Sequence, residues 1–502
     1  MKISVFLSLV LTGSSFSAVS LLNKQAMSEE FKVEEKVVQG DPSLGAVKAF
    51  NEGNYLAAVL RARSLAEEGN MYGLLVMGLA YEKGKGIEPS TELALTHYRK
   101  AREAGSAEAA YRLVGLLISA GSDDQRKEAR EVLESLVKDD DGKAARLIGE
   151  GMLKGWFGGD PEFNKIQSWW EAAAEKGDVS AMMGLARLHD GEFGFPEKRN
   201  PQSALQEYQR AAKWGHAPAM TILGARLLQQ DEKEGRKWLA KAIEGKESSA
   251  YLVLGDFTEK VIKDDALAYQ EYLKGAEAGH GQCMLKVGSF LADERAPAGD
   301  RPKDDLLKDA LGWFKKAGAA GQILGHVQAA KILLQGEGLD VVEGYNHLVV
   351  AADSGLVDLQ NELGLLYISG RLGVRDASAA AGWFRRATEG KSPAGAFNLA
   401  SLYEQGMGVP QNYDQAGRLY TLAANSGHAR STTALGRFHA EGRGTKQNLP
   451  QAWALFSLAV ERGDESAKGL IEQVGRNLDA EGLIKAQEFL AEFQKAPKPG
   501  GG

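Results

Sequence analysis

The chain of 502 residues has an ordinary globular composition, with 44% hydrophobic and 25% charged residues. Its 60 glycines and 13 prolines indicate many helix ends and tight turns and exclude a disordered proline-rich chain. The formal net charge is -7 and no basic tract stands out, so nucleic acid is a poor candidate partner.

The N-terminus has the features of an export signal. A lysine supplies the positive charge, residues 3–11 are apolar but too few to span a bilayer, and small residues follow. Cleavage after Ser17 or Ser20 fits this pattern. We expect a signal peptide over 1–20, a linker over 21–50 and an exported chain, periplasmic or extracellular, with no transmembrane segment after cleavage. An uncleaved anchor and a cytosolic chain are the alternatives.

A six-residue pattern recurs eleven times, at steps of 31 to 42 residues. Its last position is always glycine or alanine, and its first is small except at Leu359. Glycine inside a helix costs about 1 kcal/mol relative to alanine, so this repetition indicates a helix that neighbouring helices approach closely. We call it helix A. The copies are 73–78, 110–115, 144–149, 181–186, 219–224, 250–255, 283–288, 325–330, 359–364, 395–400 and 431–436.

A second helix, helix B, follows most copies of helix A. Ala94, Tyr98 and Ala101 show its pattern, which ends at Gly105. Spacings of four and three place these residues on one helical stripe, and the final glycine suits a left-handed C-cap. We expect the aromatic ring to fill the space that the small residues of helix A leave open.

Turns with two glycines separate helix A from helix B. Glycine closes such a turn because it adopts positive φ without strain. A phosphate-binding loop is excluded, because no strand precedes the glycines and no Gly-Lys-Ser/Thr follows them. The glycine pairs stand at 84 and 86, 336 and 338, 406 and 408, and 442 and 444.

The repeating unit, Leu-Gly-x-x-Tyr-x-x-Gly-x-Gly-Val followed by Ala-x-x-x-Tyr-x-x-Ala-Ala-x-x-Gly-His, resembles the Sel-one-like repeat family, a relative of the tetratricopeptide repeats. The best copies lie at 398–428 and 71–105. The resemblance implies an all-α fold, a right-handed superhelical solenoid of about eleven hairpins over 51–464, with helix A on its concave face. It also implies a scaffold or adaptor for protein complexes.

The chain after the repeats is predicted to form capping helices over 465–495. Leu483 and Ala486 lie on one side of the second of these helices, together with later apolar residues. The tail 496–502 is rich in proline, glycine and lysine and is predicted to be disordered.

The sequence contains no recognisable catalytic arrangement, and we expect no catalytic residue, cofactor or metal site. No two of the eight histidines form a His-x-x-x-His pair. His216, His280 and His428 each follow the glycine that ends a helix B, which predicts a structural role. The single cysteine, Cys283, occupies a small position of helix A and is expected to be buried. The rival interpretation is a nucleophile of a cell-wall peptide or β-lactam hydrolase.

Two aromatic turns and two polar residues of helix A are the candidate partner contacts. Trp156 and Phe157 flank one glycine turn and Phe193 lies in the next; such rings anchor a peptide or stack on sugars, or else pack where the family places valine. Glu362 and Asn398 lie on helix A. We predict a non-catalytic scaffold that binds a protein or peptide on its concave surface. The alternative is a protein that binds cell-wall glycan or peptidoglycan.

Overall fold

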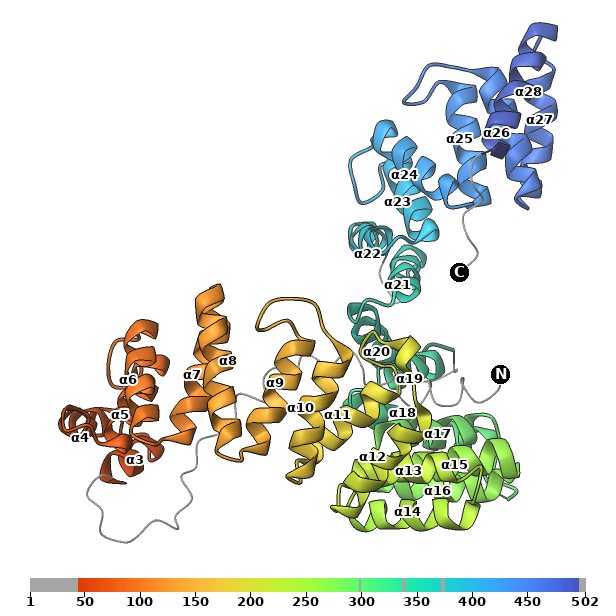
Figure 1. The fold of residues 1–502 in the computed structure, drawn as a ribbon. Helices are drawn as coiled ribbons and strands as arrows, with labels where there is room; N and C mark the ends of the chain where they lie inside the picture. Colours follow the sequence, from red (N-terminus) through yellow and green to blue (C-terminus); the bar gives the residue numbers. More distant parts are fainter. Residues whose placement is uncertain (1–43, 298, 336–339, 372–374, 496–502) are drawn as a thin grey trace. The chain divides into compact units, whose positions relative to one another are not determined.

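The all-α fold is confirmed. The computed structural model describes residues 44–297, 299–335, 340–371 and 375–495, and every regular element in these ranges is a helix (Figure 1). None of the described helices is long and apolar enough to cross a bilayer. The predicted signal peptide, the tail 496–502 and the glycines at 336 and 338 lie outside the described residues.

The chain divides into two compact units. Unit 1 comprises Met1–Glu247 and unit 2 comprises Ser248–Gly502. The helices of unit 1 are α3 (Leu44–Asn51), α4 (Tyr55–Glu67), α5 (Met71–Lys83), α6 (Thr91–Glu103), α7 (Ala107–Ala120), α8 (Asp123–Lys138), α9 (Gly142–Leu153), α10 (Phe163–Glu175), α11 (Val179–His189), α12 (Pro201–Lys213), α13 (Ala217–Leu227) and α14 (Glu232–Glu244), with a short 3-10 turn η1 (Pro196–Lys198).

Unit 2 continues the same alternation of helices A and B. Its helices are α15 (Ser249–Phe257), which a π-helical turn η2 (Thr258–Ile262) extends, α16 (Asp265–Glu277), α17 (Gly281–Ala292), α18 (Lys303–Ala319), α19 (Ile323–Gln335), α20 (Val341–Asp353), α21 (Val357–Ser369), α22 (Ala377–Glu389), α23 (Pro393–Gln405), α24 (Tyr413–Asn425), α25 (Ala429–Glu441), α26 (Leu449–Glu461), the 3-10 turn η3 (Glu465–Ala467), α27 (Lys468–Gly475) and α28 (Ala480–Lys495).

Helices A and B pair into eleven hairpins within the described residues, from α5–α6 to α25–α26. Before them, α3 pairs with α4 and buries Val47 and Phe50. The predicted linker 21–50 therefore overlaps α3, and the rest of it lies outside the described residues. The right-handed sense of the superhelix stays a prediction.

The two small positions of helix A face two different neighbours. A Cβ added to Gly78, a second small position, would lie 2.5 Å from the ring of Tyr98 in the following helix B. A Cβ added to Gly325, a first small position, would lie 2.5 Å from the carbonyl oxygen of Phe314 in the preceding helix B. The predicted packing of aromatic rings on small residues is thereby confirmed. The same ring contact joins Gly149 and Trp170, Gly255 and Tyr272, Gly288 and Phe314, Gly364 and Phe384, and Gly436 and Phe456.

The loop between helices A and B also links successive hairpins. Its second glycine lies against the first residue of the preceding helix B: a Cβ at Gly86 would lie 2.6 Å from the carbonyl oxygen of Tyr55, and one at Gly444 would lie 3.0 Å from that of Tyr413. Gly86 also has φ 76°, so the position demands glycine for both its conformation and its space.

The last two helices, α27 and α28, pack on α26. Val474 joins Phe456 and Ala459 of α26 in one hydrophobic cluster. Ala486 is the buried residue of α28, while Leu483 of the same helix is exposed. The last helix B is therefore covered on one side by two helices outside the repeat pattern.

Candidate interaction surface

One row of helix A residues differs between the two units. We call it the A row: the residue two positions before the second small residue of each helix A. In unit 1, α5, α7 and α9 place Val76, Leu113 and Leu147 in this row, and all three are buried in one hydrophobic cluster. Here the row is part of the core.

Four consecutive A helices of unit 2 place polar residues in the A row. Lys286, Gln328, Glu362 and Asn398 stand there in α17, α19, α21 and α23, and none of them is buried. The first A-row residue of unit 2, Val253 in α15, is buried. The remaining members of the row, Gly184 in α11, Ile222 in α13 and Ala434 in α25, are half-buried.

The polar row has exposed neighbours on the same side of the helices, and we call this group the A face. In α19, Leu324 and Lys331 lie one turn before and after Gln328; in α21, Leu365 lies one turn after Glu362, a spacing that puts residues on one helix face. Leu324 is 59% exposed and Leu365 46% exposed. The A face comprises Leu324, Gln328, Lys331, Glu362, Leu365 and Asn398.

Several polar side chains of the A face have no hydrogen-bond or ion-pair partner among the described residues. Gln328, Lys331 and Glu362 form no hydrogen bond or ion pair with any described residue. Asn398 donates a hydrogen bond from Nδ2 to Oδ1 of Asn361 in α21, at 2.8 Å. This face therefore presents an amide, an ammonium and a carboxylate beside exposed leucines.

Lys286, by contrast, is committed to an ion-pair network. Its ammonium lies 2.8 Å from Glu259, which also accepts from the hydroxyl of Tyr272 and from Arg295. Burial alone would raise the pKa of Glu259, but the bonds from Lys286, Tyr272 and Arg295 outweigh burial and lower this pKa to about 2. The side chain of Lys286 thus stabilises α17 against α15 and α16 rather than facing a partner.

The predicted aromatic contacts are half-buried and pack on their own repeats. The rings of Trp156 and Phe157 lie against Gly151. Phe193 packs edge-on to Trp170, with ring centroids 5.7 Å apart, and the Arg187 guanidinium lies 4.9 Å from the Phe193 centroid. The two turns join different hydrophobic clusters, which share the neighbours Met152 and Trp169. The structure places these rings where they fill space, and their role in binding stays a prediction.

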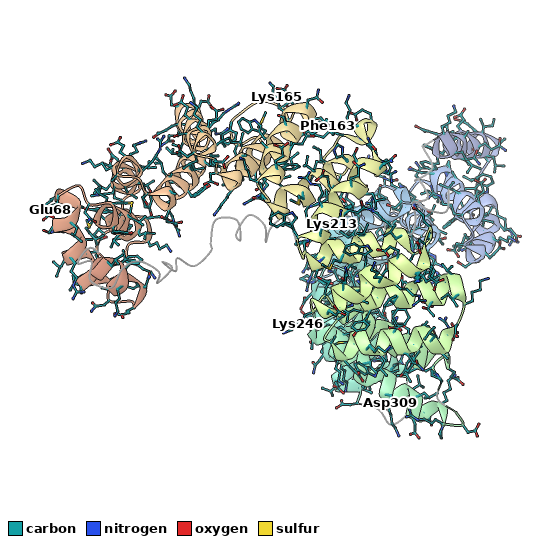
Figure 2. All side chains as sticks on the ribbon, turned by 60° about the horizontal axis from the view of Figure 1, so that its bottom comes forward. Glu68, Phe163, Lys165, Lys213, Lys246 and Asp309 are labelled. Atoms are coloured by element: carbon teal, nitrogen blue, oxygen red, sulfur yellow. The ribbon has the colours of Figure 1, made fainter. Side chains whose placement is uncertain are left out.

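The two kinds of loop lie on opposite edges of unit 1. Phe163 and Lys165 stand at the start of α10, beside the aromatic turns, whereas Lys213 ends α12 and Lys246 follows α14 (Figure 2). The A–B loops with their half-buried rings therefore occupy one edge, and the shorter B–A turns occupy the other.

The histidines that follow helix B are N-caps of the next helix A. Nδ1 of His216 accepts the backbone N–H of Ala219 at 3.2 Å, and His428 accepts that of Ser431 at 3.3 Å. His280 does the same for Cys283 at 3.3 Å. The predicted structural role is confirmed and specified: an imidazole replaces the Asn, Ser or Asp side chain that caps the A helices α5, α7, α9, α11 and α23.

Two histidines that are scattered in the sequence meet in the hairpin α19–α20. Nδ1 of His326 lies 2.7 Å from Nδ1 of His347, and Lys315 of α18 pairs at 2.7 Å with Glu343, one turn before His347. Within the described ranges, no group of three or more His, Cys, Asp or Glu residues is arranged to hold a metal ion. The histidine pair was not predicted, because its members are 21 residues apart and match no spacing rule.

Cys283 is fully buried in α17. A Cβ added to Gly275 would lie 2.5 Å from its sulfur, so the thiol fills the gap between α16 and α17. Burial, and to a smaller extent the charge of Asp256, raise the pKa of the Cys283 thiol to about 12. A thiol in this state is protonated at neutral pH, which argues against the nucleophile that a hydrolase would need.

These features define the class of protein: a solenoid of α-helical hairpins whose charged and aromatic side chains chiefly stabilise the repeats. The family model described as Sel1 repeat matches eight segments, which together cover more than half of the chain: 72–106, 143–178, 179–216, 220–246, 283–322, 357–392, 393–428 and 429–464. The chain belongs to the Sel1 repeat family. The hairpins α7–α8, α15–α16 and α19–α20 lie mostly outside the matched segments.

The chain is similar to several known proteins. The chain is 24% identical over 423 residues to an uncharacterized protein of Neisseria meningitidis serogroup B, covering 78% of this chain and 77% of that protein. The crystal structure of an SLR-fold protective antigen of uropathogenic Escherichia coli is 22% identical, covers 88% of this chain and 95% of its own, and has a TM-score of 0.46. A Sel1 repeat protein of Oxalobacter formigenes is 25% identical, covers 48% and 98%, and has a TM-score of 0.35.

Proposed function

We propose that this protein is an exported, non-catalytic scaffold that binds a protein or peptide partner on the A face of unit 2. The observation that carries the proposal is the change of the A row from buried leucine and valine in α5, α7 and α9 to polar residues in α17 to α23, of which Gln328 and Glu362 have no hydrogen-bond or ion-pair partner among the described residues. A solenoid needs apolar residues where its helices pack. Polar residues with unused hydrogen-bonding capacity in an equivalent row are more simply explained by contact with another molecule.

The chemistry of the A face favours a polypeptide in an extended conformation. Gln328 and Asn398 offer amides to the peptide backbone, Lys331 and Glu362 offer charges of opposite sign, and Leu365 offers an apolar contact. Contacts of this kind are individually weak, and a long repeat array gains affinity by making several of them at once.

Site-specific photocrosslinking tests the A face. Benzoylphenylalanine replaces Leu365, which is 46% exposed on α21, and in a matched control it replaces Leu422, which is 50% exposed on the B helix α24. In the native host we expect a defined, saturable adduct from position 365 alone, lost when Glu362→Ala and Asn398→Ala are added. Equal adducts from both positions, or an adduct insensitive to the two substitutions, would overturn the proposal.

Export is a separate part of the proposal, supported by the N-terminal sequence pattern. The full chain, tagged at its C-terminus and expressed in the native host, is expected in the periplasm or the medium, with a mature N-terminus directly after Ser17 or Ser20. Recovery of the intact chain in the cytosolic fraction would contradict it.

Cell-wall glycan binding through Trp156 and Phe193 is the competing hypothesis. The half-buried rings leave less surface for stacking on a sugar than free aromatic side chains do. Co-sedimentation with purified sacculi that disappears in a Trp156→Ala/Phe193→Ala double variant, while Glu362→Ala/Asn398→Ala has no effect, would favour the glycan hypothesis over the A face.

A further inference from the structure

The outward side of helix α20, a helix B of unit 2, exposes apolar side chains. Val342, Asn346 and Val350 follow one another at intervals of four residues, which places them on one side of the helix. Val342 is 70% exposed and Val350 is 45% exposed, and Asn346 between them is also exposed. We call these three residues the α20 stripe. Exposed apolar side chains that are aligned in this way are a candidate contact surface.

Ion pairs place the helices α18 and α22 on either side of α20. Lys315 of α18 pairs with Glu343 at 2.7 Å, and Arg386 of α22 pairs with Asp353 at 2.6 Å. Both acids belong to α20, so the neighbouring helices already balance its charges, and the α20 stripe between these pairs carries none. Recognition at this surface therefore depends on apolar contact and shape more than on net charge.

Both flanking helices have a glycine at the step of the repeat where α20 has Asn346. These are Gly312 in α18 and Gly382 in α22, each two residues after the first alanine of the helix B pattern. A Cβ added to either glycine would meet no described atom within 4 Å outside its own stretch of helix. Glycine is unfavourable in a helix interior, and packing within the described chain does not require it at these two positions. The two glycines leave room for a molecule that lies along α20.

The last helix B, α26, shows what covers this surface elsewhere in the chain. Ala454 and Leu458 of α26 stand at the steps of the second and third residues of the α20 stripe, and both are buried. Helix α28 packs on α26, and Gln494 of α28 donates a hydrogen bond to Oε1 of Glu461 at 2.8 Å. Glu461 occupies the step at which α20 has Asp353. The covered side of α26 and the exposed side of α20 are therefore equivalent in the repeat.

Helix α28 has the residue pattern that fits such a surface. Its buried and half-buried residues recur at intervals of three and four, so they lie on one side of the helix. Most of its exposed residues are charged or carry an amide. An amphipathic helix with small residues among large apolar ones thus covers the outward side of a helix B. The residues on its covered side are Gly482, Ala486, Phe489, Leu490 and Phe493.

We propose that the outward surface of α18, α20 and α22 binds an amphipathic α-helix of a partner protein. The apolar side of that helix lies on Val342 and Val350, its backbone approaches the two flanking glycines, and a donor side chain bonds to Asp353 as Gln494 does to Glu461. A lipid bilayer fits less well, because it binds large side chains that project from a surface, whereas valine and glycine project little. This surface consists of B helices, so it is separate from the A face and does not depend on it.

A peptide copy of α28 is the probe, because it has the pattern that the proposal requires. It spans 480–495 and carries a fluorophore, and its control carries Ala486→Glu and Leu490→Glu on the apolar side. Fluorescence anisotropy with the full chain is expected to show saturable binding of the first peptide. The control should bind at least about tenfold more weakly, because contact would strip its glutamates of water.

Variants of the full chain locate the site. Val342→Ser/Val350→Ser should weaken peptide binding about tenfold by removing apolar contact. Gly382→Gln should weaken it at least about fivefold by placing a side chain where the peptide approaches, while thermal stability is kept or raised, since glutamine favours a helix more than glycine does. Leu422→Ser is the matched control, because Leu422 is an exposed apolar residue of a helix B, α24, outside this surface. It should bind the peptide like the wild type.

Wild-type affinity in the double valine variant or in Gly382→Gln would overturn the proposal, since the peptide would then bind elsewhere, for instance on α26 in place of α28. Equal affinity of the two peptides, or no binding at millimolar peptide, would also overturn it. The A-face variant Glu362→Ala/Asn398→Ala should bind the peptide like the wild type, so failure at this surface and failure at the A face can be told apart.

Two further measurements test other occupants of the α20 stripe. In sedimentation velocity, concentration-dependent dimers that Val350→Ser abolishes would assign the stripe to a second copy of the chain. Co-sedimentation with phosphatidylglycerol vesicles that the double valine variant abolishes would assign it to a lipid surface. Either result would overturn the proposal; a monomer that does not bind the vesicles is expected.

Discussion

The A row serves two purposes in one fold. In α5, α7 and α9 its residues Val76, Leu113 and Leu147 are core, while in α17 to α23 the equivalent positions are polar and at least partly exposed. Both stretches build the same hairpins with the same contact between a small residue and a helix B ring, at Gly78 in one and Gly364 in the other. The hairpin therefore depends on the small positions, and the A row is free to become either core or surface.

The largest expected effect is in the core part of the row. Leu113→Ala removes a fully buried side chain and should lower the free energy of unfolding by about 2–5 kcal/mol. Leu365→Ala, on the A face, should change it by no more than about 0.5 kcal/mol. Urea unfolding followed by circular dichroism measures both, and similar losses would mean that the A face contributes to the core as much as the buried part of the A row does.

The small positions should matter in both units, and a matched pair of glycines tests this in unit 2. Gly364→Ala places a methyl group against the ring of Phe384 and should cost about 1–3 kcal/mol. Gly382 in α22 has nothing within 4 Å of an added Cβ, so Gly382→Ala should stabilise the helix by about 0.5–1 kcal/mol. Gly364→Ala should therefore lower the melting temperature and Gly382→Ala should raise it. A shift in the same direction in both variants would refute the packing role of Gly364.

Acid should weaken the two units to different extents. Burial lowers the pKa of His216 in unit 1 and of His428 in unit 2 below 6.5. The neutral rings accept a backbone N–H, so the caps are intact above about pH 6.5 and are lost as the pH falls and the rings take up protons.

Two further histidines of unit 2, His347 and His439, have a pKa lowered by burial, against one further histidine of unit 1, His97. Burial and the neighbouring His326 lower the pKa of His347, with Lys315 acting in the same direction and Glu343 opposing it. We expect the amides of unit 2 to lose more hydrogen-exchange protection than those of unit 1 between about pH 7 and 5. His428→Asn, which keeps a cap, should remove part of this loss, about 0.5–2 kcal/mol; an unchanged pH profile would contradict the assignment.

The smallest expected effect on stability is on the A face itself. Glu362 is exposed and has no partner in the part of the chain that the structure describes, so Glu362→Ala should change the unfolding free energy by less than about 0.5 kcal/mol while weakening the crosslink from position 365. A large loss of stability would show that Glu362 supports the fold and would remove it from the interaction surface.

The packing of the hairpins could be predicted from the sequence because it depends on local spacing. The small positions, the helix B aromatics and the glycine turns each recur with a fixed distance along the chain, and Gly78 and Tyr98 meet as that spacing requires. Cys283 was also placed correctly, since it occupies a position that is glycine, alanine or serine in most copies.

The features that the sequence left open depend on how separate helices align. His326 and His347 meet because α19 and α20 are antiparallel at one register, and no spacing rule contains that register. A hollow between Leu449 of α26 and Asp479 exists because the turn before α28, and not another repeat, lies beside the start of α26. The sequence predicted part of the A face, since Glu362 and Asn398 were named as candidate contacts. That Gln328 and Lys331 have hydrogen-bonding groups without a partner among the described residues follows only from the structure.

The first small position of helix A contacts the preceding helix B and the second contacts the following helix B, so each hairpin is an interchangeable module. Gly395 of α23 packs on Ala387 of α22, as Gly73 of α5 packs on α4 and Gly325 of α19 packs on α18. If residues 393–428 were deleted, Ser431 of α25 would take the place of Gly395 on α22, because both stand at the same step of the repeat. Arrays of this kind can therefore lengthen or shorten during evolution by the gain or loss of whole units, with each junction remaining the same surface.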